Sequence, residues 1–338
     1  MSKTLKVAVI GMHIGTSHAE GVLKYGAEIA AICDLNPETL KQTGDRCHVP
    51  EDRRYLDYHD ILARKDIDVA IIATPDQLHL KMSEEFLAAG MHVLCEKPLA
   101  LTRPELEAIV ALTRKYPKQK YMVGQVCRYN PCFIKLKELY DEGRIGELFF
   151  AESEYAHDYY KLLPEWRRDP NRYGVIGGGC HAVDLLRWIA GDPTEVFAYA
   201  NHKMLPMIVT EDATIAVLKF PNDVIGKIYV STGCKRPYTM RTQLYGSKGT
   251  LLYESGKDYV ELYTLGEDGI AVNPTPELVP VERQSHNMYG EFCDLAKIID
   301  EDLPVAMSAE EGAKSIATCL AIVESTKTGM PVKPNYQF

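Results

Sequence analysis

Residues 5–18 read LKVAVIGMHIGTSH, and this stretch decides the fold of the first part of the chain. Leu5–Ile10 is typical of a parallel strand buried on both faces, because its apolar residues do not alternate with polar ones. Gly11 and Gly15 fit the outer positions of a glycine-rich turn. Such a turn lets the backbone approach a pyrophosphate, and the helix after it directs N–H groups at the anion. The middle glycine of Gly-x-Gly-x-x-Gly is missing and the spacing is one residue short, so a plain strand-to-helix turn stays open as the alternative.

Short apolar runs and helical patterns alternate as far as residue 125. The further expected strands are Ile29–Cys33, Val69–Ala73, His92–Leu94 and Tyr121–Val123. The expected helices are Ser17–Tyr25, Pro37–Arg46, Gln77–Ala89 and Pro104–Tyr116. Thr102 is the expected N-cap of the last helix, and Gly90 is expected to stop the third. Strand–helix alternation with short links predicts a right-handed, parallel α/β sheet.

The second expected strand ends at Asp34. An acidic residue at this place in a dinucleotide-binding fold accepts hydrogen bonds from the adenine-ribose hydroxyls and repels a 2′-phosphate. No arginine follows in Leu35-Asn36-Pro37. The sequence therefore favours NAD over NADP, with a helix N-cap as the alternative role of Asp34.

Several motifs further along the chain share one resemblance. They are Ala73-Thr74-Pro75 followed by His79, Cys95-Glu96-Lys97-Pro98, Gly124–Pro131 (GQVCRYNP), Trp166–Pro170 (WRRDP) and Gly177–Asp184 (GGGCHAVD). Together they resemble the Gfo/Idh/MocA family of glucose–fructose oxidoreductase, inositol dehydrogenase and relatives, over almost the whole chain. The resemblance implies an NAD-dependent oxidoreductase that acts on CH–OH groups. It also implies an α/β Rossmann domain at 1–125 and an α+β domain at 126–338 for substrate binding and oligomerisation.

The residues themselves support a large, open, mostly antiparallel sheet in the second domain. Strands rich in aromatic and β-branched residues are expected at Glu147–Tyr155, Val196–Asn201, Thr214–Phe220, Val224–Val230 and Gln243–Gly246. Pro221-Asn222-Asp223 should form a tight connection between two of them. Ser308–Glu311 has the pattern of a capping box and should open the last helix, at about 308–328, which is expected to pack back near the Rossmann domain.

Hydride transfer between an alcohol and a nicotinamide needs a group that tunes the hydroxyl and a base for its proton. Lys97 follows a parallel strand at the carboxyl edge, where ligands bind in such sheets, and the resemblance also implies that it contacts the reacting oxygen. His181 is the expected base, because an imidazole titrates near neutrality. The alternatives are a surface lysine paired with Glu96 and a capping or packing histidine. Pro98 should fix the turn after Lys97, and a cis bond before it is an option.

One departure from the family concerns the residue four positions before this histidine. Many sugar dehydrogenases of the family carry an aspartate there, whereas this chain has Gly177. The two-residue relay therefore does not transfer to this chain. Gly177-Gly178-Gly179 would let the backbone come close to the nicotinamide. Asp184, one helical turn after His181, could orient the imidazole, or it could cap or bind a neighbouring helix.

Two further sets of residues complete the expected site. The expected cofactor-binding residues are Gly11, His13, Ile14, Asp34, Ala73, Thr74, Pro75, His79, Glu96, Lys97 and Gln125. The expected substrate-binding residues are Lys97, Arg128, Tyr155, His157, Tyr159, Trp166, Arg167 and His181, with Tyr160 as a further candidate. Aromatic faces stack on sugar C–H surfaces, and hydroxyl, imidazole and guanidinium groups bind sugar oxygens. An ordinary sheet or loop role is the alternative for each residue in the substrate set.

Composition limits the other classes of function. The 338 residues favour two domains, and the net charge of −9 argues against a nucleic-acid surface. The N-terminal residues are not expected to act as a signal peptide, and no apolar stretch of the sequence is long enough to span a membrane. Nine cysteines without a Cys-x-x-Cys pair indicate reduced thiols in the cytoplasm, and the dispersed histidines form no local metal motif. The open sheet has a face to cover, so a homodimer or homotetramer is expected.

Three functions agree with these residues. The first is a dehydrogenase or reductase acting on a sugar, a cyclitol or a sugar derivative. The second is a redox-neutral glycosidase or lyase that oxidises a sugar carbon transiently with tightly held NAD. The third is an NAD-binding sensor, although the presence of both Lys97 and His181 speaks against it.

Overall fold

The computed structural model describes residues 4–266, 268–284 and 286–338 and separates into two compact units. Unit 1 comprises Met1–Val126, Asn287–Ala313 and Phe338. Unit 2 comprises Cys127–His286 and Lys314–Gln337. A segment near the C-terminus therefore belongs to the same unit as the N-terminal strands.

The described part of unit 1 contains a six-stranded sheet in the order β3-β2-β1-β4-β5-β6. The strands are β1 Lys6–Ile10, β2 Glu28–Cys33, β3 Arg54–Tyr55, β4 Val69–Ile72, β5 His92–Glu96 and β6 Tyr121–Gly124. Every neighbouring pair is parallel, which confirms the expected Rossmann sheet. The carboxyl ends of β1, β4 and β5 consequently lie at one edge of the sheet.

The helices of unit 1 confirm the expected alternation. They are α1 Gly15–Tyr25, α2 Pro37–Arg46, α3 His59–Leu62, α4 His79–Ala88, α5 Arg103–Lys115 and α9 Met288–Asp300. Gln77 lies in a 3₁₀ turn, Asp76–Leu78, so α4 begins at His79 rather than at Gln77. Helices α3 and α9 and strand β3 were not expected. Helix α9 packs against α1, where a β-carbon on Gly21 would lie only 2.9 Å from the backbone nitrogen of Tyr289.

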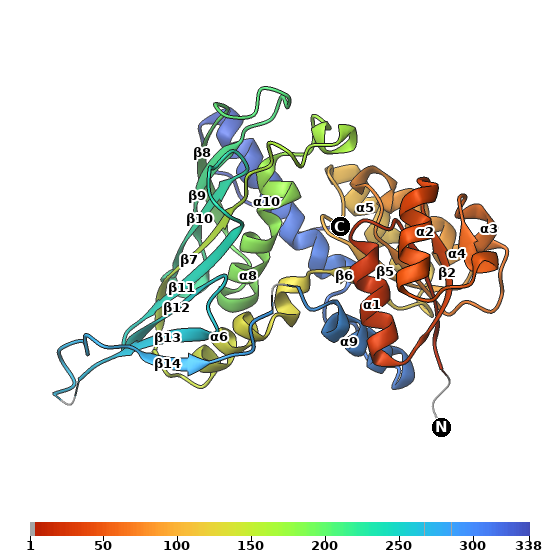
Figure 1. Ribbon diagram of the computed structural model, residues 1–338. Coiled ribbons are helices and arrows are strands. Elements are labelled where there is room, and N and C mark those ends of the chain that lie inside the picture. Colours follow the sequence, from red (N-terminus) through yellow and green to blue (C-terminus); the bar gives the residue numbers. More distant parts are fainter. Residues whose placement is uncertain (1–3, 267, 285) are drawn as a thin grey trace. The chain divides into compact units, whose positions relative to one another are not determined.

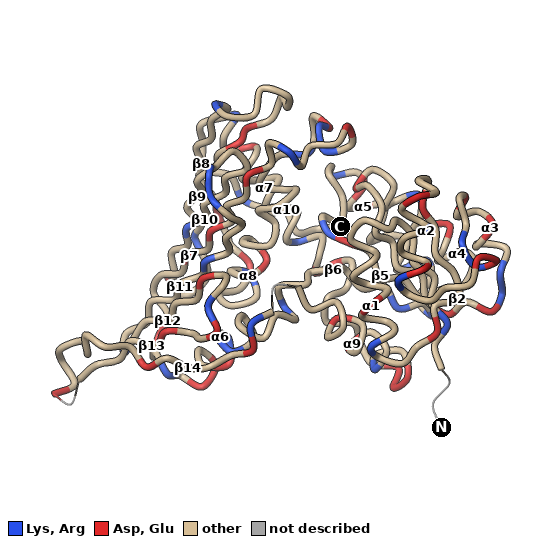
Figure 2. The backbone as a smooth tube through the Cα atoms, in the orientation of Figure 1, with Lys and Arg blue, Asp and Glu red and all other residues tan. Residues whose placement is uncertain are grey.

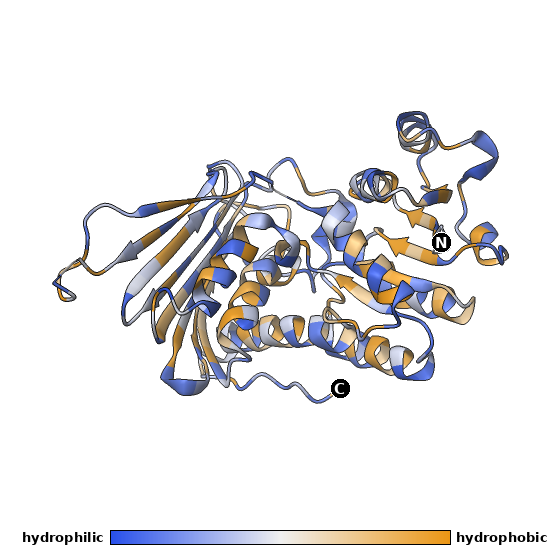
Figure 3. Ribbon diagram, turned by 90° about the horizontal axis from the view of Figure 1, so that it is seen from below, coloured by the Kyte–Doolittle hydropathy of each residue, from blue (hydrophilic) through white to orange (hydrophobic). Residues whose placement is uncertain are grey.

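The core of unit 1 consists of the strands themselves. Val7, Ala8 and Val9 of β1 are fully buried, as are all four residues of β4. Figure 3 shows these strands as almost uniformly hydrophobic, in contrast to the alternating strands of the other sheet. This burial on both faces explains why an unbroken apolar run predicted a parallel strand.

The described part of unit 2 contains an eight-stranded sheet in the order β14-β13-β12-β11-β7-β10-β9-β8. Its strands are β7 Leu148–Ala156, β8 Glu195–Asn201, β9 Ala213–Lys219, β10 Ile225–Ser231, β11 Thr239–Gly246, β12 Gly249–Glu254, β13 Tyr259–Thr264 and β14 Glu277–Pro280. The pair β7/β10 is parallel and the other described pairs are antiparallel, which confirms the expected mostly antiparallel sheet. The turn Pro221–Asp223 joins β9 to β10 as expected. Strands β12, β13 and β14 were not expected.

Helices cover one face of this sheet (Figure 1). They are α6 Pro131–Asp141, α7 Gly174–Gly177, α8 Cys180–Ala190 and the part of α10, Ala309–Thr328, that belongs to unit 2. Ser308 Oγ accepts from the Glu311 N–H at the start of α10, in agreement with the expected cap. Each helix among the described residues is too short or too polar to span a membrane. All nine cysteines are free thiols.

The start of α5 offers a test of local stability. Glu105 Oε2 accepts hydrogen bonds from the N–H groups of Leu101 and Thr102 and from the Thr102 hydroxyl. We expect Glu105→Ala to lower the free energy of unfolding by about 1–2 kcal/mol, because two backbone donors lose their acceptor. Glu107→Ala on the same helix removes only an exposed pair with Arg103, so it should cost less than about 0.5 kcal/mol. Urea unfolding of the full chain measures both, and equal losses would contradict the role of Glu105.

Candidate active site

The turn after β1 packs directly on the turn after β4. Gly11 has a φ of +89°, and a β-carbon there would lie 2.5 Å from the carbonyl oxygen of Ala73. No other residue type meets both conditions, because the conformation is left-handed and the space is filled by backbone. The N-terminus of α1 at Gly15 follows at the same edge. This is the close cradle that a pyrophosphate requires, although the glycine pattern is incomplete.

Asp34 holds this turn to the end of β2. Its Oδ2 accepts from the Met12 N–H at 2.6 Å, and its Oδ1 accepts from the Asn36 N–H at 2.8 Å. The N-cap of α2 is Asn36, whose side chain accepts from Glu38 N and Thr39 N, so the alternative role of Asp34 as the cap is wrong. Each carboxylate oxygen can accept a second hydrogen bond, and the fold leaves Asp34 suited to ribose hydroxyls.

Gln125 follows β6 and is fully buried. Neither the oxygen nor the nitrogen of its side-chain amide has a hydrogen-bond partner among the described residues. A buried amide without partners costs free energy of the order of 1–3 kcal/mol per group, so a polar ligand group beside it would be stabilising. Together with the Gly11 cradle and Asp34, this orphaned amide fits a bound dinucleotide.

Lys97 follows β5 and is joined to Pro98 by a cis peptide bond. The Glu96 side chain before it is buried, with Oε1 2.8 Å from His18 Nε2 and Oε2 accepting from the Lys97 N–H at 3.0 Å. Both Glu96 oxygens are therefore occupied by the protein. Within the described ranges Lys97 forms no ion pair, in contrast to the alternative of a surface lysine paired with Glu96. The structure therefore shows Glu96 supporting the backbone of Lys97, and its contact with the cofactor stays a prediction.

A second buried carboxyl group, Glu291 of α9, lies behind His18. Glu291 is fully buried, and its Oε2 lies 4.0 Å from His18 Nδ1. Burial, with Glu96 and Asp294 nearby, raises the pKa of Glu291 well above its usual value. Burial also opposes ionisation of Glu96, but hydrogen bonds and charges from His18 and Lys97 outweigh it and lower the pKa of Glu96. The pKa values of the two buried carboxyl groups are therefore shifted in opposite directions, which favours the ionised form of Glu96 and the protonated form of Glu291.

In unit 2, the expected substrate residues Tyr155, His157 and Tyr159 form an aromatic cluster beside His181. The Tyr155 hydroxyl lies 2.7 Å from the Tyr159 hydroxyl and 3.3 Å from His157 Nδ1. The Tyr155 ring lies 6.4 Å from the His181 ring, centroid to centroid. The ring centroid of Tyr238 lies 5.7 Å from that of Tyr155 and 5.1 Å from that of His157. Sequence reasoning missed Tyr238, because it follows Pro237 before β11 and belongs to none of the recognised motifs.

Two arginines extend this cluster. Arg167 lies 4.9 Å from the Trp166 ring centroid and 5.7 Å from that of Tyr159, and Arg172 lies 5.2 Å from Trp166. Arg172 was not a candidate, yet it is buried. Tyr160, by contrast, is 54% exposed and lies beside Lys235, which makes it the least enclosed of the candidates.

The three glycines before Cys180 differ from the expectation. A β-carbon on Gly177 would lie 2.2 Å from Arg172 Nη1, and one on Gly178 would lie 2.4 Å from the Tyr155 ring. One on Gly179 would meet the Val230 side chain at 2.5 Å. The space beside each glycine is thus filled by protein side chains, so these glycines serve packing within unit 2. The Arg172 guanidinium therefore occupies the space that the side chain of the family's usual aspartate would need at position 177.

The Asp184 carboxylate binds Arg128 and Ser315, which lie on other parts of the chain than the helix of His181. It accepts from Arg128 Nε at 2.8 Å and Nη2 at 2.9 Å, and from Ser315 Oγ at 2.7 Å. This is the second of the two expected roles, in which Asp184 binds neighbouring elements. Arg128 uses two donors of its guanidinium in the same fork, so both residues anchor the helix that carries His181.

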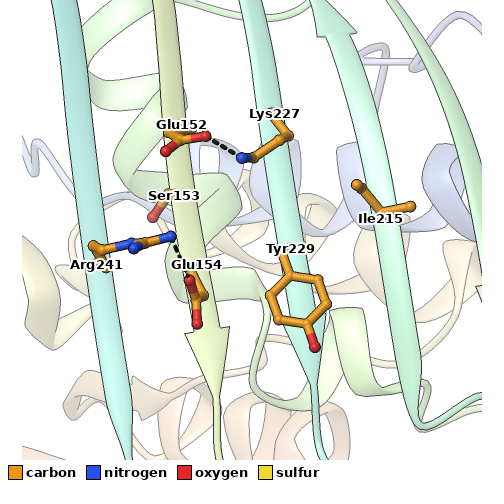
Figure 4. Close-up of a pocket in the computed structure, with 7 residues that line it drawn as sticks. All are labelled: Glu152, Ser153, Glu154, Ile215, Lys227, Tyr229 and Arg241. Atoms are coloured by element: carbon orange, nitrogen blue, oxygen red, sulfur yellow. Dashed lines mark ion pairs between the residues drawn. The ribbon is translucent and has the colours of Figure 1, made fainter.

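A pocket opens on the face of the unit 2 sheet that the helices do not cover (Figure 4). It is lined by Glu152, Ser153, Glu154, Ile215, Lys227, Tyr229 and Arg241. Its charges are paired, with Lys227 on Glu152 and Arg241 on Glu154. Side chains alternate along a strand, so this pocket and Tyr155 lie on opposite faces of β7. None of the expected site residues lines it.

Comparisons with known proteins identify the family. Residues 5–125 match the oxidoreductase family with an NAD-binding Rossmann fold, and residues 133–252 match the GFO/IDH/MocA C-terminal domain. The chain belongs to the Gfo/Idh/MocA oxidoreductase family. As in the rest of this family, the first domain is an NAD-binding one, and the cradle around Gly11 and Asp34 fits that cofactor.

Named relatives within the Gfo/Idh/MocA family are dehydrogenases. The chain is 25% identical over 348 residues to inositol 2-dehydrogenase of Salmonella typhimurium, covering 98% of this chain and 99% of that protein. It is 27% identical to D-apiose dehydrogenase of Rhizobium rhizogenes, covering 97% of each. Levoglucosan dehydrogenase with NADH and levoglucosan shares the fold, with a TM-score of 0.89 at 21% identity, covering 99% of this chain and all of that one.

The buried Glu291 predicts a distinctive dependence of stability on pH. Its pKa is raised by folding, so its contribution favours the folded state below the unfolded pKa of about 4.3 and weakens as pH rises toward the folded value. Glu291→Gln removes this titration. We expect the stability of the variant relative to the wild type to increase by up to about 1.4 kcal/mol per pH unit above pH 5.

Urea midpoints of both proteins between pH 5 and 8 measure this effect. Glu301→Gln, at the exposed end of the same helix, is the matched control and should follow the wild-type curve. A constant difference between Glu291→Gln and the wild type across this range would show that Glu291 is ionised in the folded protein.

Proposed function

We propose that this Gfo/Idh/MocA protein is an NAD-dependent dehydrogenase or reductase. It would move a hydride between the nicotinamide and a hydroxyl-bearing carbon of a sugar, cyclitol or related polyol. The main support is the position of Lys97. It follows β5 at the carboxyl edge of the nucleotide-binding sheet and has no ion pair among the described residues. Inositol and apiose dehydrogenases among the relatives support a polyol as substrate.

Bound NAD supplies the hydride acceptor, and the residues of the chain hold the two reactants. Gly11, with His13 and Ile14 in the same turn, would hold the pyrophosphate at the N-terminus of α1. Asp34 would accept from the ribose hydroxyls, and the buried amide of Gln125 would bind a polar group of the cofactor. Ala73, Thr74 and Pro75 would line the cofactor from the turn after β4.

Lys97 and His181 would divide the work on the alcohol. The ammonium of Lys97 would donate a hydrogen bond to the reacting oxygen and stabilise the developing alkoxide. His181, only 2% exposed and close to the Tyr155 ring, would take the proton as general base. The cluster of Tyr155, His157 and Tyr159, with Trp166 and Arg167, would bind the remaining hydroxyls.

The chain gives no specific support to the other two functions. A redox-neutral glycosidase or lyase and an NAD-binding sensor would use the same cofactor cradle. The named relatives above are dehydrogenases, and the cluster around His181 is richer in proton-transferring groups than a sensor requires. We therefore keep net oxidation or reduction as the proposal.

Activity on a panel of sugars and polyols tests this function. With NAD, we expect at least one polyol to produce NADH, followed at its absorbance band, and much weaker turnover with NADP because of Asp34. Lys97→Ala and His181→Ala should each lower kcat at least about 100-fold, since each removes a group that acts in the transition state. Glu107→Ala is the control and should match the wild type.

Three results would count against the proposal. Wild-type kcat in both Lys97→Ala and His181→Ala would remove the assigned chemistry. Turnover of a glycoside with no net NADH would show the redox-neutral reaction instead. Binding of a polyol by the wild type without any turnover would favour the sensor.

A second copy of the chain is proposed to cover the open face of the sheet in unit 2. This face carries the apolar side chains Tyr199, Ile215 and Val217, which are 67%, 44% and 49% exposed. Figure 2 shows acidic and basic residues along the same strands, and those around the pocket pair with each other. An apolar patch with internally paired charges suits a self-complementary interface.

Light scattering at micromolar concentration tests this assembly. We expect the mass of a dimer or tetramer for the wild type, and a smaller particle for Ile215→Glu with Val217→Glu, because charges would enter the interface. Val209→Glu changes an apolar residue that is 76% exposed outside the sheet, and it should keep the wild-type mass. A monomeric wild type would contradict the proposed assembly.

A further inference from the structure

His79 connects the two turns that flank the candidate site in unit 1. It is the first residue of α4, and only 1% of it is exposed. Its Nδ1 lies 2.9 Å from the Pro98 carbonyl oxygen, and its Nε2 lies 3.2 Å from the Thr74 carbonyl oxygen. The imidazole therefore faces backbone on both sides, and sequence reasoning had placed it against the cofactor.

Both carbonyl partners of this ring are acceptors. A carbonyl oxygen cannot donate, so each ring nitrogen must carry a hydrogen to form a hydrogen bond. A neutral imidazole has one N–H and would leave the other nitrogen lone pair against an oxygen lone pair. The pair of carbonyls thus selects the imidazolium, which has two donors.

The groups around the ring agree with a positive charge. Burial favours the neutral form, but the Cys95 sulfur, Asp76 and the Thr74 carbonyl outweigh it and raise the pKa of His79 to about 10. Cys95 comes from β5 and Asp76 from the 3₁₀ turn before α4, so the charge is supported from two elements. With this pKa, the imidazolium is the form expected at neutral pH.

The two carbonyls belong to the turns that matter for catalysis. Thr74 lies in the turn after β4, and this turn packs so closely on Gly11 that it leaves no room for a β-carbon there. Pro98 follows Lys97 directly, across the cis bond. A hydrogen bond at each turn fixes the distance between the cofactor cradle and the backbone of Lys97. On the other side, Lys97 N is held by Glu96, which in turn is held by His18.

We propose that His79 is a positioning residue whose imidazolium ties the cofactor-binding turn at Thr74 to the Lys97–Pro98 turn. This inference rests on the proposed role of Lys97. His79 itself would touch neither cofactor nor substrate. It would hold the backbone of Lys97 at a fixed distance from the cofactor-binding turn, so that a displacement of one turn would also displace the other.

The charge state of His79 can be read directly in the full-length wild-type protein. Histidine labelled with ¹⁵N, observed at pH 8, should show one buried ring with both nitrogens protonated, and His79→Gln should remove that signal. A signal from His79 with one protonated and one bare nitrogen at pH 8 would overturn the proposal. This measurement does not depend on knowing the substrate.

Kinetics separate positioning from general stability. His79→Gln should lower kcat by up to about 100-fold, the loss expected when a catalytic group is displaced by about 1 Å, and should raise KM for NAD as well. His92→Gln, at the opposite end of β5, is the matched control, because His92 accepts from the Lys120 N–H far along the strand from Lys97. It should leave kcat and KM at wild-type values.

The outcomes distinguish the two proposals. Equal kinetics for His79→Gln and His92→Gln, with Lys97→Ala inactive, would overturn the positioning role and leave the function intact. Wild-type kcat in Lys97→Ala would refute the proposed role of Lys97, on which this inference rests, while the protonation of the ring would still decide whether His79 forms its two hydrogen bonds. Loss of kcat in His79→Gln alone among the two histidine variants, with the doubly protonated ring, would support the role.

Discussion

The contact between Gly11 and the Ala73 carbonyl is the constraint on which the nucleotide-binding unit depends. It brings the turns after β1 and β4 together with no room for a β-carbon. Asp34, at the end of β2, is joined to the turn after β1 because its carboxylate accepts from the Met12 N–H. His79 joins the turn after β4 to the turn after β5 through the carbonyl oxygens of Thr74 and Pro98. Four strand ends are therefore fixed mainly by backbone groups, and the side chains of the candidate site project from a rigid edge.

Much of this edge could be predicted from sequence because its signals are local. Apolar runs without alternation predicted β1, β2, β4, β5 and β6, and the motif around Lys97 predicted which strand end carries the chemistry. The incomplete glycine pattern understated the fit, since only Gly11 has the positive φ and the close contact that demand glycine. The family resemblance supplied the roles that spacing alone could not.

The missed features arise from contacts between distant parts of the chain. Nothing near Glu291 in sequence indicates that it is buried behind His18, because α9 reaches α1 from more than 250 residues away (291 − 18). Arg172 over Gly177 and the pairing of Asp184 with Arg128 and Ser315 are likewise long-range or depend on a loop path. Sequence patterns report which face of an element is apolar. They do not report which polar group will meet which.

Strand β7 has a consequence for how this enzyme can change. Tyr155 points to the helix-covered face and Glu154 to the open face, so neighbouring positions serve two separate surfaces. Substitutions at alternate positions can therefore alter one surface while sparing the other. An insertion or deletion of a single residue within the strand would exchange the two sets and damage both at once. Variation in this strand should accumulate as replacements, with changes of length confined to its ends.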